Sequence, residues 1–437
     1  MIVANDKNFE VDRQMLFWSI LAFGFLVRIV AMVIYADTNP NTANLWEYGE
    51  IARESIAFGD LVRVNHLPNG SPIGPYPTAF MPPLPIFVWI SIFSSLGDNH
   101  YGLATFLIMN LCLSMAILYF IHSITYKLTN SHGAALGAMA IATIYPTFAV
   151  SPTTYHAIQI YLSLFLCGVN IVLSSDRISH RKIMLLGVIG GFAALTRTEY
   201  ILLFAAIYTG SFLIYGRYKK FLLATLISAL VVLPWTVRNY IIFEEFIPVA
   251  NITGFGFIKG FNEHANGSGD WIDNNNIIQD IAGEYSYTIS GDRMFEFAYD
   301  QFLLSEAKKF VAANPVDAFL YLPIKKMALF WGFDVYDPMS YNLFYQIALW
   351  FTFVLSMGAL LFGRNRVASQ LRGRDIYAYR IRVVIGIMMA QSFIICIYAV
   401  HLRYRMNVDP FLFSLAGVGL VIFVRKYLPG FRLSKDD

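Results

Sequence analysis

The chain has 437 residues, of which 57% are hydrophobic and only 14% are charged. Soluble domains carry about 25% charged residues, so this composition excludes an ordinary soluble protein and predicts a membrane protein with many spans. The net charge of +3 says little by itself, because the distribution of charge along the chain sets the orientation of a membrane protein in the bilayer. No nucleic-acid partner is expected. The three cysteines lie far apart in apolar runs, which predicts neither a disulfide framework nor a metal site.

An α-helix needs about 20 mostly apolar residues to cross a bilayer. Pro83–Leu96 is apolar but shorter and follows prolines, so we expect an interfacial or re-entrant helix there. The sequence predicts an all-α polytopic fold with about ten transmembrane helices, at 15–35, 102–122, 133–150, 155–174, 183–197, 200–215, 221–238, 342–363, 383–401 and 409–425.

Basic loops orient this stack, since short loops rich in Lys and Arg remain in the cytoplasm. Such loops are Arg177–Lys182, Arg217–Lys220, the segment 364–382 with its six arginines, and the C-terminal tail. Ten spans put these loops and both termini in the cytoplasm, and put the loops 36–101 and 239–341 outside. Residues 241–320 hold twelve Asp and Glu against four Lys and Arg, so the long outer loop is acidic.

The chain accordingly divides into three parts. Residues 1–238 form an N-terminal transmembrane module with the first outer loop, 239–341 form an extracytoplasmic segment, and 342–437 hold the C-terminal transmembrane helices. In the middle part, the glycines and asparagine of 254–260 and 266–270 predict turns and loops. The pattern of Arg293–Val311 predicts an amphipathic helix.

The first outer loop holds three carboxylates at helical spacing. Glu47, Glu50 and Glu54 stand at i, i+3 and i+7, so on a helix they share one face. A carboxylate beside the membrane can act as a general base, and we assign this role to Glu47. The alternative is that these carboxylates are solvated and pair locally with Arg53.

More ionisable residues fall on the same predicted side of the membrane. They are Arg197 and Glu199 between the fifth and sixth spans, Arg238 at the end of the seventh, and His401, Arg403, Arg405 and Asp409 between the ninth and tenth. Charged groups near membrane depth are costly and usually functional. Carboxylates and several arginines in one plane indicate a site for an anionic lipid head group beside an acid or base.

Sugar transfer from a lipid phosphate suits such a site. We expect Arg403 and Arg405 to hold the phosphate through charge-assisted hydrogen bonds. We expect Glu47 to take a proton from an acceptor hydroxyl, which attacks the anomeric carbon as the phosphate leaves. A single displacement, which we expect, inverts the anomeric centre, whereas a double displacement retains it.

Each arginine also has a structural alternative. Arginines near lipid snorkel to phosphates, Arg197 has Glu199 as a neighbour to pair with, and Arg238 at a helix end complements the dipole. Arg28 lies within the first span, where a bare charge costs about 2.5–3.5 kcal/mol at the bilayer centre. We therefore expect it to be paired inside the bundle or to lie near the inner surface.

Several stretches carry a family likeness. They are Glu47–Ala52, the proline-rich Phe80–Pro85, Tyr145-Pro146, Gly191–Glu199, Pro234–Tyr240 followed by Gly254–Asn262, and Arg403–Pro410. With these stretches in this order, the chain resembles the GT-C superfamily of polyprenyl-phosphate-sugar-dependent membrane glycosyltransferases. Within it, the chain is most similar to the bacterial relatives of protein O-mannosyltransferases and of the lipid A aminoarabinose transferase. The resemblance covers nearly the whole chain.

The resemblance implies a GT-C fold and sugar transfer outside the cytoplasm, with an acidic residue of the first loop as the catalytic carboxylate. That position matches Glu47, but the family usually has Asp there, often as an acidic pair, which leaves Glu50 as an alternative base. We expect the donor phosphate on Arg403, Arg405, Arg238, Arg53 and Tyr404, and the substrate on Arg197, Glu199, Tyr48, His401, Asn262 and Lys259. No cofactor is assigned, and a divalent metal, which some members use, stays open.

The expected partners are a polyprenyl-phosphate-linked hexose or pentose, an acceptor lipid, polysaccharide or protein, and membrane lipids. The expected location is the bacterial inner (cytoplasmic) membrane. One competing function is an O-antigen polymerase or ligase that uses lipid-diphosphate glycans. Another is a transporter or flippase, which is disfavoured because the charges gather at one face and no inverted repeat is visible.

Overall fold

The computed structural model describes residues 9–174, 179–215, 218–269, 274–290, 292–362, 375–427 and 431–433. The first half contains β1 (Phe9–Val11), α1 (Arg13–Tyr35), α2 (Trp46–Phe58), β2 (Val62–His66), β3 (Pro72–Pro77), α3 (Pro83–Leu96), α4 (His100–Thr129), α5 (His132–Ile144), α6 (Pro146–Val150), η1 (Ser151–Thr153), α7 (Ile158–Val172), α8 (His180–Ala194), α9 (Glu199–Tyr215) and α10 (Tyr218–Phe243). The second half contains α11 (Thr253–Gly260), α12 (Asn274–Thr288), α13 (Phe295–Ala313), η2 (Asp317–Tyr321), α14 (Leu322–Trp331), η3 (Pro338–Tyr341), α15 (Leu343–Phe362), α17 (Asp375–Ile397), α18 (Leu402–Arg405), α19 (Asp409–Tyr427) and β4 (Phe431–Leu433). Parts of the predicted basic loops (175–178, 216–217 and 363–374) and the end of the predicted turn at 266–270 lie outside the described residues.

A helix lies at each of the ten predicted spans. Six helices of the described chain, α1, α4, α10, α15, α17 and α19, are long and apolar enough to cross a membrane. The pair His132–Ile144 and Pro146–Thr153, bent by 67° at the proline, makes a seventh if it counts as one span. The protein is therefore a multi-pass membrane protein, and the number of ten spans stays a prediction.

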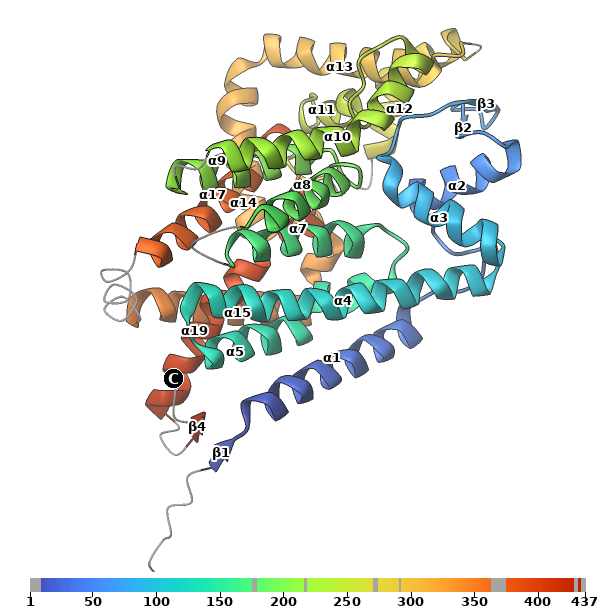
Figure 1. The fold of residues 1–437 in the computed structure, drawn as a ribbon. Coiled ribbons are helices and arrows are strands. Elements are labelled where there is room, and N and C mark those ends of the chain that lie inside the picture. The colour runs from blue at the N-terminus through green and yellow to red at the C-terminus, as the bar shows by residue number, and fades with distance from the viewer. Residues whose placement is uncertain are drawn as a thin grey trace, which may run out of the picture.

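The long helices pack closely where small residues meet. α19 packs against both α5 and α15. A Cβ added at Gly417 would lie 2.2 Å from the carbonyl oxygen of Ala134, and one at Gly419 would lie 2.0 Å from that of Leu355. Small residues allow such close backbone approach between membrane helices. In Figure 1 the long helices run side by side, α11, α12 and α13 gather at the top, and α2 and α3 lie at the right.

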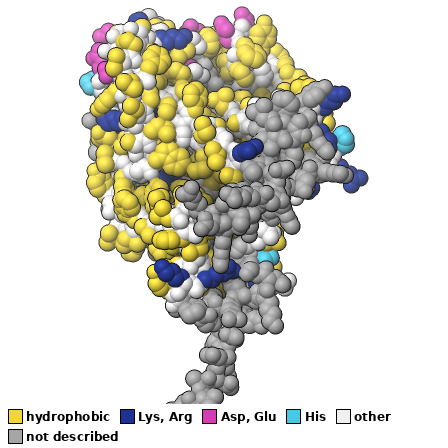
Figure 2. All heavy atoms as spheres, turned by 90° about the vertical axis from the view of Figure 1, so that its left-hand side faces the viewer, with side chains coloured by type: hydrophobic (Ala, Val, Ile, Leu, Met, Phe, Trp, Pro, Cys, Tyr) yellow, Lys and Arg dark blue, Asp and Glu magenta, His cyan; other side chains and the backbone are white. Residues whose placement is uncertain are grey.

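Much of the described surface is apolar. Large hydrophobic side chains are exposed along α1 and α15, for example Val33 at 82% and Phe344 at 76%. Figure 2 shows hydrophobic side chains over most of the described surface on one side, with Asp and Glu side chains at its upper edge. Apolar patches of this extent are rare on soluble monomers, so lipid is the solvent that suits these faces.

Arg28 is fully buried in the helix bundle. Its guanidinium donates to the Ser114 hydroxyl and to the backbone carbonyl oxygens of Gly24 (3.1 Å) and Phe148 (3.2 Å). These neutral acceptors offset part of the cost of burying the cation. Of the two predicted alternatives, the structure shows Arg28 inside the bundle with hydrogen-bond partners.

The loops differ from the prediction in two places. The segment 254–260, predicted as turns, forms helix α11, because the Asp300 carboxylate accepts hydrogen bonds from the backbone N–H groups of Gly254 (3.0 Å) and Phe255 (2.9 Å) at the helix start. The first outer loop also contains an antiparallel hairpin of β2 and β3, which the sequence did not indicate. The predicted amphipathic helix at Arg293–Val311 is confirmed as α13.

Candidate active site

The first wall of the site is the N-terminal turn of α2. Trp46 has a backbone φ of 56°, which non-glycine residues adopt uncommonly, and its N–H donates to the side chain of Asn44 (3.0 Å). The helix then buries Tyr48 and Ile51 and leaves Glu47 half-buried in its first turn. The positive end of a helix dipole favours a carboxylate at this place.

The second wall is the turn between α8 and α9. Arg197 and Glu199 form an ion pair, and both side chains are mostly buried. The Arg197 guanidinium lies 4.8 Å from the ring centre of Tyr161 and 4.7 Å from that of Tyr404. A planar guanidinium stacks well on aromatic faces, so the rings and the carboxylate together fix its position.

The third wall follows the end of α17. The Gly269 N–H donates to the carbonyl oxygen of Val400 (2.6 Å), and the Val400 N–H donates to that of Gly267 (2.9 Å). These backbone hydrogen bonds take the place of the helical ones after the end of α17, and the residues that follow Val400, namely His401, Arg403 and Tyr404, line the pocket. Burial, and then the nearby Arg403 and Lys259, hold the pKa of His401 well below its ordinary value.

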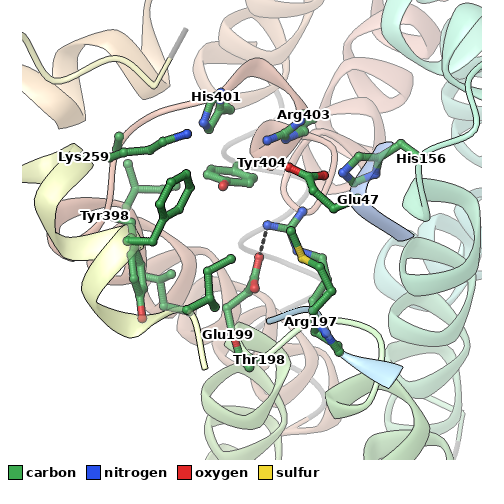
Figure 3. Close-up of a pocket in the computed structure, with 18 of the residues that line it drawn as sticks. Glu47, His156, Arg197, Thr198, Glu199, Lys259, Tyr398, His401, Arg403 and Tyr404 are labelled. Atoms are coloured by element: carbon green, nitrogen blue, oxygen red, sulfur yellow. Dashed lines mark ion pairs between the residues drawn. The ribbon is translucent and has the colours of Figure 1, made fainter. Parts of the chain in front are cut away.

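The three walls enclose a pocket of about 170 Å³. In Figure 3 the Glu47 carboxylate points toward Arg197 and Arg403, and Lys259 extends toward His401 from the other side. The pocket thus places a carboxylate beside cations from segments separated by most of the chain, as predicted. Eight predicted site residues line it: Glu47, Tyr48, Arg197, Glu199, Lys259, His401, Arg403 and Tyr404.

The other carboxylates of the first loop do not line this pocket. Glu50 is exposed and pairs with Arg53 (3.1 Å), whose guanidinium also binds Asp98 (2.7 Å). Glu54 accepts a hydrogen bond from the Val64 backbone N–H (2.9 Å) in β2. Along the helix, Glu50 is rotated by about 60° from Glu47, and Glu54 lies about 10 Å further along the axis. The local partners hold both groups away from the pocket.

Two other predicted binding residues have structural contacts. Arg238 donates to the carbonyl oxygens of Thr78 (2.8 Å) and Leu61 (3.4 Å), so it joins α10 to the first loop. Asn262 donates to the carbonyl oxygen of Ile258 (2.7 Å) at the end of α11. Neither residue lines the pocket.

Arg403 and Arg405, predicted to act as a pair, face different surroundings. Arg403 lines the pocket, with its guanidinium 5.3 Å from the centre of the Trp46 ring. Arg405 is buried behind it, where it pairs with Asp409 (3.4 Å) and donates to the carbonyl oxygen of Gly332 (3.1 Å). Both arginines belong to the short helix α18, and residues two apart on a helix point in nearly opposite directions, about 160° apart.

A buried carboxyl group joins the long loop to the pocket. Glu296 of α13 accepts hydrogen bonds from the Thr78 hydroxyl (2.5 Å) and the Ala79 N–H (2.7 Å). The same segment continues along the chain to Met81 and Pro82, which line the pocket. Burial raises the pKa of Glu296 to about 7, although these hydrogen bonds and the nearby Arg63 oppose the shift.

Sequence reasoning missed several pocket residues, among them Trp46, His156, Thr198, Tyr398 and Gln391. The predicted span at 155–174 includes His156. The polar run Ser151–His156 that interrupts the apolar pattern was the available signal, and the structure begins α7 only at Ile158.

The described residues contain no group of three or more His, Cys, Asp or Glu side chains placed to hold a metal ion. The side chains that line the pocket include two carboxylates, three cationic groups and two imidazoles.

The fold defines the class: this is a multi-pass membrane protein with the GT-C fold. Its fold matches that of the archaeal oligosaccharyltransferase AglB from Archaeoglobus fulgidus, solved with an inhibitory peptide and a dolichol-phosphate, with a TM-score of 0.54 at 13% identity over 94% of this chain. A structure of the Archaeoglobus fulgidus oligosaccharyltransferase tethered to an acceptor peptide matches with a TM-score of 0.55 at 11% identity over 95% of this chain. The chain spans about half the length of these two proteins, 50% and 52% in the two comparisons.

A third solved structure, ArnT from Cupriavidus metallidurans bound to undecaprenyl phosphate, aligns with 94% of this chain and 79% of its own. Its identity is 14% and its TM-score is 0.43. No protein-family model and no curated protein sequence matches this chain.

Proposed function

We propose that this protein transfers a sugar from a polyprenyl-phosphate carrier to an acceptor hydroxyl on the extracytoplasmic side of a bacterial cytoplasmic membrane. The observation that carries the proposal is the pocket in which Glu47 lies with Arg197, Arg403 and Lys259. The fold supports it, because AglB shares this fold and was solved with a dolichol-phosphate.

In the proposed reaction, the donor phosphate lies against Arg403 and Lys259. The Glu47 carboxylate accepts the proton of the acceptor hydroxyl as the hydroxyl oxygen forms a bond to the anomeric carbon. The bond from that carbon to the phosphate oxygen breaks, and the polyprenyl phosphate leaves with the electron pair. The cations stabilise the charge that develops on the phosphate, and a single displacement inverts the anomeric centre.

Two groups have positioning roles in this proposal. The Arg197–Glu199 ion pair holds Tyr404 by stacking, and the buried Tyr48 lines the pocket and packs against His156. Arg53, Arg238 and Arg405 are left out of the phosphate site, because their guanidinium groups bind other parts of the protein.

The test compares Glu47→Gln with Glu50→Gln, its matched control on the same helix. The purified proteins are reconstituted in nanodiscs with envelope lipids and glycans as acceptors, and supplied with radiolabelled undecaprenyl-phosphate-linked hexoses and pentoses. We expect Glu47→Gln to lower the transfer rate about 10²–10⁴-fold, since it removes the general base, and Glu50→Gln to transfer at close to the wild-type rate.

Transfer by Glu47→Gln at the wild-type rate would exclude Glu47 as the base. Loss of transfer in Glu50→Gln alone would assign the role to the exposed carboxylate instead. A wild-type protein that consumes lipid-diphosphate glycans, and no lipid-monophosphate sugar, would show a polymerase or ligase.

A further inference from the structure

His156 is a buried polar residue of the pocket that the mechanism above does not use. It lies between η1 and α7, is only 6% exposed and lines the same pocket as Glu47. Its Nδ1 atom is enclosed and has no hydrogen-bond partner among the described residues. A buried nitrogen without a partner is costly, so this position calls for a ligand group that can hydrogen-bond to it.

The imidazole is held by aromatic rings on several sides. Its centre lies 5.0 Å from the Trp46 ring, 5.8 Å from the Tyr48 ring and 6.2 Å from the Tyr161 ring, each nearly perpendicular to it. Edge-to-face contacts of this kind are favourable and directional. They restrict the rotation of the imidazole and fix the direction in which its nitrogens can bind a ligand.

The backbone around His156 is fixed as well. The Asn110 side chain donates to the carbonyl oxygen of Thr154 (2.9 Å), the Tyr155 hydroxyl donates to that of Asp37 (2.6 Å), and the Gln159 side chain donates to the Ser151 hydroxyl (2.8 Å). A polar side chain held this firmly on both sides is preorganised for binding.

The neighbouring Trp46 carries a second sign of a built site. Its positive φ of 56° is uncommon for a large side chain, and such conformations persist where the surrounding structure enforces them, often at ligand sites. The conformation brings the indole ring against His156 and beneath the Arg403 guanidinium. Glu47 follows directly in the chain, so the aromatic surface and the proposed base are adjacent.

We propose that His156 hydrogen-bonds a hydroxyl of the sugar on the donor lipid, with the Trp46 ring against the sugar face. This inference rests on the proposed function and adds the group that recognises the transferred sugar. A hydroxyl both donates and accepts hydrogen bonds, so it can bind either neutral tautomer of the imidazole. The donor phosphate, in contrast, binds Arg403 and Lys259 in the proposed reaction. A site built around a hydroxyl discriminates against a sugar that lacks it, because the nitrogen is then left without a partner.

The experiment measures lipid binding to the full-length protein in nanodiscs by native mass spectrometry. The probes are undecaprenyl phosphate and undecaprenyl-phosphate-linked glucose, mannose and arabinose. We expect His156→Phe to lower the affinity for the sugar-bearing lipid that the wild type prefers by about tenfold, as for one lost buried hydrogen bond. Its affinity for undecaprenyl phosphate stays unchanged.

His156→Asn provides the rescue, because its amide places a polar atom close to the position of Nδ1. We expect it to retain the wild-type preference for the sugar-bearing lipid within about threefold. The matched control is His122→Phe in α4, whose imidazole packs edge-on against Phe17 outside the pocket. This control binds both lipids as the wild type does.

Equal losses for both lipids in His156→Phe would indicate a merely structural role and overturn the inference, as would an unchanged preference for the sugar-bearing lipid. These outcomes are distinct from failure of the proposed function, in which the wild type itself binds neither lipid. That result would overturn both proposals.

Discussion

Glu296, which joins the long loop to the segment beside the pocket, offers a quantitative test through the pH dependence of the free energy of unfolding. Glu296→Gln keeps the shape of the side chain. The amide oxygen can accept the Ala79 hydrogen bond that the carboxylate accepts now. At Thr78 the direction of the bond reverses, because the hydroxyl now donates to the carboxylate, whereas the amide nitrogen would donate to the hydroxyl oxygen. The substitution therefore removes the titration and keeps both groups within reach of a hydrogen bond.

The magnitude follows from the pKa of the buried carboxyl group. It rises from an ordinary value of 4.5 to about 7 in the folded protein, so between these pH values the folded state binds more protons than the unfolded state. The stability that this group contributes is then fully present below pH 4.5 and is lost as the pH rises to 7 and above. At about 1.4 kcal/mol per pH unit, the loss at pH 7.5 is about 3 kcal/mol.

The assay is thermal unfolding in detergent from pH 4.5 to 8. We expect Glu296→Gln to match the wild type at the acidic end and to be more stable by about 3 kcal/mol at pH 7.5. The control is Glu306→Gln on the same helix, where the carboxylate pairs with Lys309 at the surface (2.6 Å). It should keep the wild-type dependence on pH. A Glu296→Gln variant with the full wild-type pH dependence would refute the argument.

Three further substitutions separate binding from folding. Arg403→Gln should weaken binding of undecaprenyl phosphate by about 10- to 100-fold, as for a lost hydrogen bond to a charged group, measured by native mass spectrometry. Arg405→Met should destabilise the fold by about 3–5 kcal/mol, since it leaves the buried Asp409 unpaired. Gly254→Ala should lower the free energy of unfolding by about 1–3 kcal/mol, because the added Cβ would lie 1.8 Å from the Asp300 carbonyl oxygen. Thermal unfolding measures the loss of stability in Arg405→Met and in Gly254→Ala.

Each of these has a matched control. Arg403→Lys keeps the charge and should bind the lipid better than Arg403→Gln. Adding Asp409→Leu to Arg405→Met should recover most of the lost stability, because no buried charge then remains without its partner. Gly283→Ala in α12 should be tolerated, since its nearest neighbour would be 3.5 Å away. Normal stability of Arg405→Met, or of Gly254→Ala, would show that these contacts are weaker than their geometry indicates.

Much of the fold could be predicted from composition and periodicity. Runs of apolar residues near the length of a bilayer span mark helices directly, and all ten predicted spans contain one. The helix α11 could not be predicted in this way, because its start is completed by Asp300, which lies 46 positions from Gly254. Local propensity favours turns at those glycines, and a distant side chain overrides it.

The sequence by itself determined the membrane class, the helical spacing of the carboxylates that include Glu47, and the polar segments that contribute to the pocket. Tertiary structure alone decided which side chains meet there. It turned Arg403 toward Trp46 and Arg405 toward Asp409, and it enclosed His156 among aromatic rings. The reason is physical: spacing along a chain specifies the face of a local helix, whereas the partner on that face comes from segments hundreds of residues away and depends on how the whole bundle packs.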